Sequence, residues 1–267
     1  MKLDLKSLII FDELCSAYDY KIGSNQKMVE ILETFAQSSF TSFPKEFFDG
    51  MRILDRKHFV VSQDELVRYA GEKLNLPEEK IRRDNIIMDA ADSLPYNISD
   101  KLAIEKSRKH FTNDITTDLM TYMLLEISKD DDVCEIPSSN GYMAAIIGMN
   151  CRSVTSFDLV KDLNGLASRN ISSAGYSKGN INFVEDVPPY RKTIKNLDNS
   201  FSKIYTNAAI SKSQYYDTKK LLREKGRMVA LVQENNKLSL VYHDGRDKIL
   251  FEMKGKYFLL ENDSNLN

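Results

Sequence analysis

Apolar residues in the second half of the chain form short runs that alternate with helical patterns. Stretches of helical spacing lie at about 141–149, 159–174 and 213–224, with a looser segment near 190–198. Seven apolar runs have the length and composition of β-strands, and they cover residues 133–136, 153–157, 181–184, 203–206, 228–232, 238–242 and 257–260. Strand–helix alternation followed by closely spaced strands predicts a mostly parallel sheet with an antiparallel edge. The His-Asp-Gly-Arg stretch at 243–246 predicts a hairpin turn between the last strands.

The first 110 residues carry helical patterns and few strand signals. Apolar residues at positions 28, 31, 32 and 35 share one face of a helix, for which Ser24 is the expected N-cap. Helical spacing continues through 43–60, and further helices are expected to begin near 62, 77 and 99. Another helical stripe follows at 115–127, with Thr116 or Thr117 as its cap. We therefore expect a helical N-terminal region, 1–110, packed on a Rossmann-like α/β domain, 111–267.

Composition narrows the class of protein. The 267 residues are 42% hydrophobic and 28% charged, which is enough to bury a substantial core. No apolar run is long enough to span a membrane, and acidic residues within the first dozen positions argue against a secretory signal. A net charge of −2 gives no general attraction to nucleic acid. We expect a cytoplasmic protein with no membrane partner.

Cysteine and histidine usage does not indicate a metal site or a disulfide framework. The three cysteines are far apart and lack CxxC spacing, so buried free thiols in a reducing compartment are expected. The three histidines share no ligand spacing. Motifs of zinc peptidases, serine hydrolases and P-loop nucleotide-binding proteins are absent from the sequence.

Polar residues stand where the first four predicted strands end, which is where parallel sheets bind ligands. The loop Ile-Pro-Ser-Ser-Asn-Gly-Tyr, 136–142, follows the first strand. Asp158 ends the second strand, 17 residues after Gly141, close to the separation expected of an acid that binds ribose hydroxyls. Asp186 ends the third strand and is placed to face an adenine edge, and Asn207 ends the fourth on the substrate side. The plainer alternatives are a helix cap for Asp158, a solvated turn for Asp186 and a simple tight turn for the loop.

Six stretches of the sequence, taken in order along the chain, match the motifs of one known family. They cover residues 51–70, 115–120, 135–142, 185–187, 201–209 and 222–228. They include Met-Arg-Ile-Leu-Asp-Arg-Lys-His-Phe-Val at 51–60 and Glu-Ile-Pro-Ser-Ser-Asn-Gly-Tyr at 135–142. Together these stretches resemble the protein-L-isoaspartate (D-aspartate) O-methyltransferases, whose second-strand acid falls on Asp158. Relative to that family, residues 71–110 form an insertion and the N-terminus is extended.

The resemblance implies a Rossmann-like methyltransferase fold with a helical N-terminal extension, dependent on S-adenosyl-L-methionine (SAM). The implied activity is methylation of isoaspartyl carboxylates in damaged proteins, so the partner is a protein or peptide substrate. The resemblance gives Thr116 as the catalytic hydroxyl that contacts the substrate carboxylate, and His58 as a second substrate-binding residue. The cofactor-binding positions that it implies are Glu135, Pro137, Ser139, Gly141, Tyr142, Asp158, Asp186 and Asn207.

Departures from the family pattern leave other functions open. Pro137 and Ser139 replace glycines, which removes one N–H and adds a side chain beside the cofactor position. Asp118 replaces a proline and brings negative charge toward a site for a carboxylate. One alternative is therefore a non-catalytic methyltransferase-fold protein that has lost SAM binding and serves as a binding or scaffold module. Another is a methyltransferase that acts on RNA or a small molecule, with residues 71–110 as a lid over the substrate. The basic stretch 105–111 is the sequence feature that favours this alternative.

Overall fold

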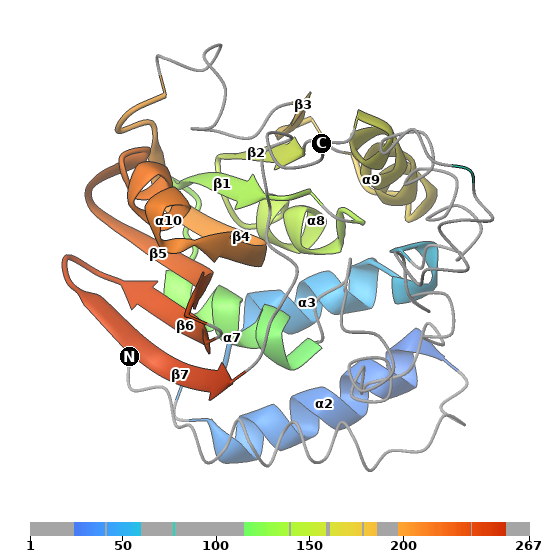
Figure 1. Cartoon of the computed structure of the whole chain (residues 1–267). Helices are drawn as coiled ribbons and strands as arrows, with labels where there is room; N and C mark the ends of the chain where they lie inside the picture. The colour runs from blue at the N-terminus through green and yellow to red at the C-terminus, as the bar shows by residue number, and fades with distance from the viewer. Residues whose placement is uncertain are drawn as a thin grey trace.

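The structure is a computed structural model that describes residues 24–40, 42–59, 77, 115–138, 140–158, 161–177, 179–185, 197–235 and 237–254. Within these residues seven strands form one sheet, in the order β3-β2-β1-β4-β5-β6-β7 (Figure 1). The strands are β1 (Asp132–Ile136), β2 (Ser153–Asp158), β3 (Ile181–Glu185), β4 (Phe201–Ser211), β5 (Leu222–Glu234), β6 (Lys237–His243) and β7 (Asp247–Lys254). The first five pair in parallel, and β6 and β7 are antiparallel. The predicted Rossmann-like sheet with an antiparallel edge is confirmed.

Helices cover both faces of this sheet. The described helices are α2 (Asn25–Ser39), α3 (Lys45–Ile53), the 3-10 helix η1 (Arg56–Phe59), α7 (Ile115–Leu125), α8 (Tyr142–Gly148), α9 (Lys161–Ser173) and α10 (Lys212–Lys219). On one face α7, α8 and α9 contact the strands, while α10 packs on the other face. Beyond α7 and α8, α3 and α2 form an outer layer (Figure 1). None of the described helices is both long and apolar enough to cross a bilayer.

Alternation along the central strands separates two buried cores. In β1, Val133 points into the core beneath α7 and α8, and Cys134 points into the core beneath α10. In β4 the same alternation sends Tyr205 to the first core and Ile204 to the second. The first core also takes up apolar side chains of α2 and α3, so the N-terminal helices and one face of the sheet share a single hydrophobic cluster. These outer helices are thereby held against the domain that carries the ligand-binding edge.

Several predicted helix limits can be compared directly with the structure. Ser24 caps α2 as predicted, because its hydroxyl accepts a hydrogen bond from the backbone N–H of Lys27 (3.3 Å). The spacing through 43–60 resolves into α3 and η1, with a break at Leu54. The predicted cap at Thr116 or Thr117 is wrong, since α7 already begins at Ile115 and both threonines lie in its first turn. The helices expected near 62, 77 and 99, and the insertion 71–110, lie outside the described residues apart from position 77.

The closing part of the sheet differs from prediction in two places. The helix expected at 213–224 ends at Lys219, because Leu222 is already paired in β5 and buried. The turn at 243–246 is confirmed, with Gly245 at φ +97°, but it leads into β7, which the sequence pattern did not indicate. The strand expected at 257–260 lies outside the described residues, as does nearly all of the segment near 190–198.

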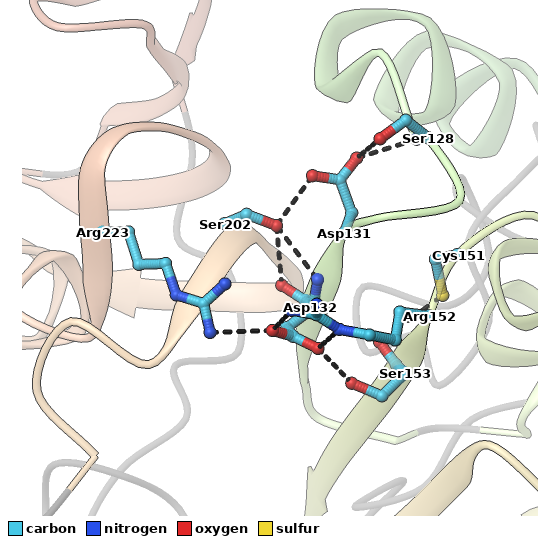
Figure 2. Close-up of polar contacts among 8 residues, drawn as sticks. All are labelled: Ser128, Asp131, Asp132, Cys151, Arg152, Ser153, Ser202 and Arg223. Carbon is cyan, nitrogen blue, oxygen red and sulfur yellow. Dashed lines mark hydrogen bonds and ion pairs between the residues drawn. The ribbon is translucent and has the colours of Figure 1, made fainter.

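Polar bonds tie the amino-terminal ends of the strands together (Figure 2). Asp132 at the start of β1 accepts hydrogen bonds from Arg152 Nε (2.8 Å) and from Arg223 Nη2 in β5 (2.7 Å). The hydrogen bond from Arg152 is the main reason that the pKa of Asp132 lies well below its usual range. Ser202 of β4 donates its hydroxyl to the neighbouring Asp131 (2.7 Å). Hydrogen bonds within the chain therefore occupy the polar groups at the amino-terminal ends of the strands. The polar groups that could bind a ligand lie at the carboxyl ends.

Gly141 is fixed by both backbone conformation and packing. It precedes α8 with φ +84°, in the left-handed region that side chains disfavour. A Cβ at this position would lie 2.9 Å from the Cβ of Ala167 and 3.0 Å from its carbonyl oxygen. The glycine therefore allows the loop after β1 to approach α9 closely.

We predict that Gly141→Ala destabilises the fold by about 2 to 4 kcal/mol, since left-handed strain and overpacking add. Gly175→Ala is the matched control, because Gly175 has φ +75° and nothing within 4 Å of an added Cβ. It should cost only about 1 kcal/mol. Urea denaturation of both variants measures the difference, and equal losses would contradict the packing argument.

Candidate functional site

The order of the strands creates a crevice between β1 and β4. The chain proceeds from β1 outward through β2 to β3, then returns to the other side of β1 as β4. In open α/β sheets such a reversal leaves a ligand-binding crevice at the carboxyl ends of the strands. Glu135 of β1 and Asp158 of β2 lie at these ends. The prediction that Asn207 ends the fourth strand is wrong, since β4 continues to Ser211, but Asn207 directly follows the part of β4 that pairs with β1.

A fully buried carboxylate, Glu135, joins the three central strands at this edge. It accepts hydrogen bonds from Tyr205 Oη (2.6 Å), Asn207 Nδ2 (2.8 Å) and the hydroxyl of Ser156. Burial raises the pKa of Glu135 to about 7, against the lowering effect of these donors, and the nearby Asp158 raises it further. The pKa of Tyr205 is raised well above its usual value, chiefly by burial.

The loop after β1 is held by side chains from its neighbours. Buried Ser138 donates its hydroxyl to Asp158 Oδ2 (3.0 Å), and both residues are nearly inaccessible to solvent. Asn207 Nδ2 also donates to the carbonyl oxygen of Pro137 (3.1 Å). Asp158, at the end of β2, therefore contacts the loop that follows β1, and the side-chain amide of Asn207 holds the first turn of the same loop. Asp158 is not simply a cap for the following helix.

Asn140 connects the loop to three other elements. Its Nδ2 donates to the carbonyl oxygen of Phe59 (2.9 Å), and its Oδ1 accepts from the backbone N–H of Tyr142 (3.0 Å). Asn170 of α9 donates to the carbonyl oxygen of Asn140 (3.0 Å). The Phe59 ring packs edge-on against the Tyr142 ring, with centroids 5.0 Å apart. The stretch 51–60 singled out from sequence thus ends directly against the loop.

A small polar cavity lies beside this junction. Its volume is about 20 Å³, enough for one water-sized group. Tyr142 is one of its lining residues and is only 4% exposed, and its buried hydroxyl has no hydrogen-bond partner among the described residues. The lining residues are Arg56, Asp118, Glu135, Asn140, Tyr142, Met143 and Asn207. The cavity therefore combines one cation, two acids and several neutral polar groups.

The structure brings together some of the site residues expected from sequence. Glu135, Tyr142 and Asn207 line the cavity; Pro137 and Gly141 shape the loop, and Asp158 contacts it. Ser139 and Asp186 lie outside the described residues. The two expected substrate-binding residues, Thr116 and His58, are not among those that line the cavity.

Thr116 and His58 lie near the site on separate elements. Thr116 Oγ1 is buried in the first turn of α7 and has no hydrogen-bond partner among the described residues. Two residues along a helix point to roughly opposite sides, so Thr116 faces away from Asp118, which lines the cavity. His58 is half-buried in η1, next to Phe59.

Sequence patterns did not single out Arg56 or Asn140 as site residues. Arg56 lies within the quoted stretch 51–60, where only His58 was selected, and Asn140 lies within the loop. Asn140 could have been found as an amide preceding a helix-opening glycine, a position typical of turns. The described residues contain no group of three His, Cys, Asp or Glu side chains arranged to hold a metal ion.

Comparison with known proteins gives a structural likeness. No protein-family model and no curated protein sequence matches the chain. A solved structure described as a protein-L-isoaspartate O-methyltransferase from Plasmodium falciparum, in complex with S-adenosyl-L-homocysteine, is similar over 88% of this chain and 98% of its own, with 13% identity and a TM-score of 0.55. A second protein-L-isoaspartate O-methyltransferase is similar over 88% of this chain and 65% of its own, with 13% identity and a TM-score of 0.52. The chain has a Rossmann-like methyltransferase fold.

We predict that Glu135 makes stability fall as the pH rises. Its folded pKa is raised from 4.5 to about 7, so the folded state favours the protonated acid, and this stability is lost between about pH 4.5 and 7. Glu135→Gln does not titrate. The free energy of unfolding of the wild type relative to this variant should therefore drop by about 3 kcal/mol from pH 4 to pH 8.

Chemical denaturation at a series of pH values measures this difference. Glu126→Gln is the control, because the hydrogen bond from Arg227 lowers the pKa of Glu126 and confines its effect to acid pH. If the difference between the wild type and Glu135→Gln stays constant between pH 4 and pH 8, Glu135 keeps one charge state throughout and the prediction is wrong.

Proposed function

We propose that this protein is a SAM-dependent carboxyl O-methyltransferase that methylates isoaspartyl carboxylates in damaged proteins. The observation that carries the proposal is the buried Asp158 at the end of β2, which faces the loop between β1 and α8 at the crevice of a methyltransferase fold. The likeness to two protein-L-isoaspartate O-methyltransferases in fold supports the same substrate class. The order of motifs along the sequence supports it independently.

The residues at the crevice fit the nucleoside part of SAM. Asp158 already accepts a hydrogen bond from a hydroxyl group, that of Ser138, and this is the bond that a ribose hydroxyl would make with it. Gly141 keeps the backbone conformation that opens α8. Asp158 would therefore hold the ribose, and Asn207 would hold Pro137 and the loop in place. When bound, SAM supplies a methyl group that its sulfonium has already activated.

Methyl transfer to a carboxylate requires little acid–base catalysis by the protein. A substrate carboxylate is itself the nucleophile, so the chain's residues have to bind it, orient it and exclude water. Thr116, whose buried hydroxyl has no partner among the described residues, is the proposed donor to this carboxylate. Glu135 is held by three donors and would support the end of β1 without taking part in proton transfer.

Methyl transfer to an isoaspartyl peptide tests the proposal. We expect the wild type to form one methyl ester per isoaspartyl residue, and Asp158→Ala to bind S-adenosyl-L-homocysteine about 10 to 100 times more weakly, because a charge-assisted hydrogen bond is lost. Labelled-methyl incorporation and calorimetry measure the two effects. Absence of binding heat at millimolar S-adenosyl-L-homocysteine would exclude the proposal and favour the non-catalytic scaffold.

The Ser138–Asp158 bond gives a second prediction. A ribose hydroxyl would have to displace the Ser138 hydroxyl, so Ser138→Ala should strengthen cofactor binding by up to about tenfold, equivalent to one hydrogen bond of about 1.4 kcal/mol. Ser202→Ala is the matched control, since Ser202 makes a similar bond to Asp131 at the opposite edge of the sheet. Weaker cofactor binding in Ser138→Ala, measured by calorimetry, would show that Ser138 supports the site.

A further inference from the structure

The side-chain amide of Asn164 is buried without a hydrogen-bond partner. Asn164 lies in the first turn of α9 and is 7% exposed. Neither its Nδ2 nor its Oδ1 has a partner among the residues that the structure describes. A buried amide in this state destabilises the fold, because it has lost its hydrogen bonds to water and has gained none within the protein. Such a group calls for an explanation in another state of the molecule.

The contacts of α9 place Asn164 on the face of this helix that packs on the loop after β1. A Cβ at Gly141, in that loop, would meet Ala167. Asn164 precedes Ala167 by three residues, and it precedes Ile171, a member of the first core, by seven. Residues at this spacing share one face of a helix. Asn164 therefore lies one helical turn from the contact with Gly141, toward the start of α9.

The bond between Ser138 and Asp158 lies at the same end of β2. Ser138 belongs to the loop after β1, is fully buried and donates its hydroxyl to Asp158 Oδ2 (3.0 Å). Asp158 ends β2, and α9 begins at Lys161, three positions later. The first turn of α9 is thereby tethered to the carboxyl end of β2. The Ser138 hydroxyl and the Asn164 amide belong to one buried region, between this helix and the loop.

Cofactor binding would break the bond between Ser138 and Asp158. When Asp158 accepts hydrogen bonds from the ribose, the hydroxyl of Ser138 loses its acceptor at a position that excludes water. A hydroxyl both donates and accepts, so it pairs with either polar atom of an asparagine side chain. Rotation about χ1 turns a serine hydroxyl to a new direction without moving the backbone. The unpaired amide of Asn164 is therefore suited to become the new partner of Ser138.

We propose that Asn164 receives the hydroxyl of Ser138 when the ribose of the cofactor takes the place of that hydroxyl on Asp158. This inference rests on the proposed function for the identity of the ligand. Asn164 is then a positioning residue, since it acts on the cofactor through Ser138. In the free protein Asn164 is the unpaired member of these three side chains, whereas in the complex all three have partners. The exchange of partners therefore favours the bound state.

Asn164→Leu separates this role from a purely structural one, because stability and binding should change in opposite directions. Leucine has the branching of asparagine without its polar atoms. The variant without cofactor should therefore melt at a temperature at least as high as the wild type, while S-adenosyl-L-homocysteine should bind about tenfold more weakly in calorimetry. Asn170→Leu is the matched control on the same helix: Asn170 donates to the carbonyl oxygen of Asn140 (3.0 Å), so this variant should melt at a lower temperature. Equal losses of melting temperature in the two variants, or unchanged affinity in Asn164→Leu, would overturn the inference.

Asn164→Ala removes the same polar atoms without adding volume, which excludes overpacking by leucine as the cause of weaker binding. It should weaken the binding of S-adenosyl-L-homocysteine by the same factor of about ten, whatever its melting temperature. Wild-type affinity in Asn164→Ala would show that the effect of leucine comes from its size, and the inference would be wrong.

A double-mutant cycle tests whether Asn164 acts through Ser138. In a Ser138→Ala background there is no hydroxyl to receive, so Asn164→Leu should leave the affinity for S-adenosyl-L-homocysteine unchanged. The same tenfold loss in both backgrounds would show that Asn164 acts independently of Ser138, which contradicts the inference. Binding by the wild type that does not depend on Asn164 would keep the cofactor site and exclude the positioning role. Absence of binding by the wild type would exclude the proposed function and, with it, this inference.

Discussion

The candidate site depends on one buried carboxylate, that of Glu135, and on the groups that hold it. A carboxyl group at the end of a central strand can be buried only if donors satisfy it. Here they come from strands on both sides of β1, Ser156 in β2 and Tyr205 and Asn207 in β4. The same carboxamide of Asn207 then holds the carbonyl oxygen of Pro137. The position of the loop is thus set by the requirement to satisfy a buried carboxyl group with hydrogen bonds.

The arrangement around Glu135 explains how the loop after β1 is held although it departs from the glycine-rich family pattern. Pro137 lacks an N–H, and its carbonyl oxygen is held by Asn207. Gly141 remains because the backbone is left-handed there and α9 is too close for a side chain. The hydroxyl of Ser138 donates a hydrogen bond to a carboxylate oxygen of Asp158. The loop has therefore lost conformational freedom at one end and gained internal hydrogen bonds, which favours one stable conformation over easy rearrangement.

Sequence patterns were sufficient where the signal is local. Apolar runs located six of the described strands, and the polar residue at the end of the second, Asp158, was placed correctly. Asn207 was selected as a site residue although it lies within β4 rather than at its end. β7 was missed because Lys248 and Glu252 flank a run of only three apolar residues, 249–251, which is too short to indicate a strand by itself. In the structure Ile249 and Phe251 are exposed on this edge strand. Arg56 and Asn140 were missed for a different reason: their roles arise only when distant segments meet.

The bond between Asn140 and Phe59 joins residues that are 81 positions apart in the chain. Contacts of this separation form late in folding, because the entropy of closing a long loop has to be overcome first. The central contact between β1 and β4 spans a similar separation, since Tyr205 and Glu135 are 70 positions apart, so it carries a similar entropic cost of loop closure. The central sheet and the ligand-binding crevice would accordingly form together, and a change in the N-terminal helices would be transmitted to the loop through Phe59.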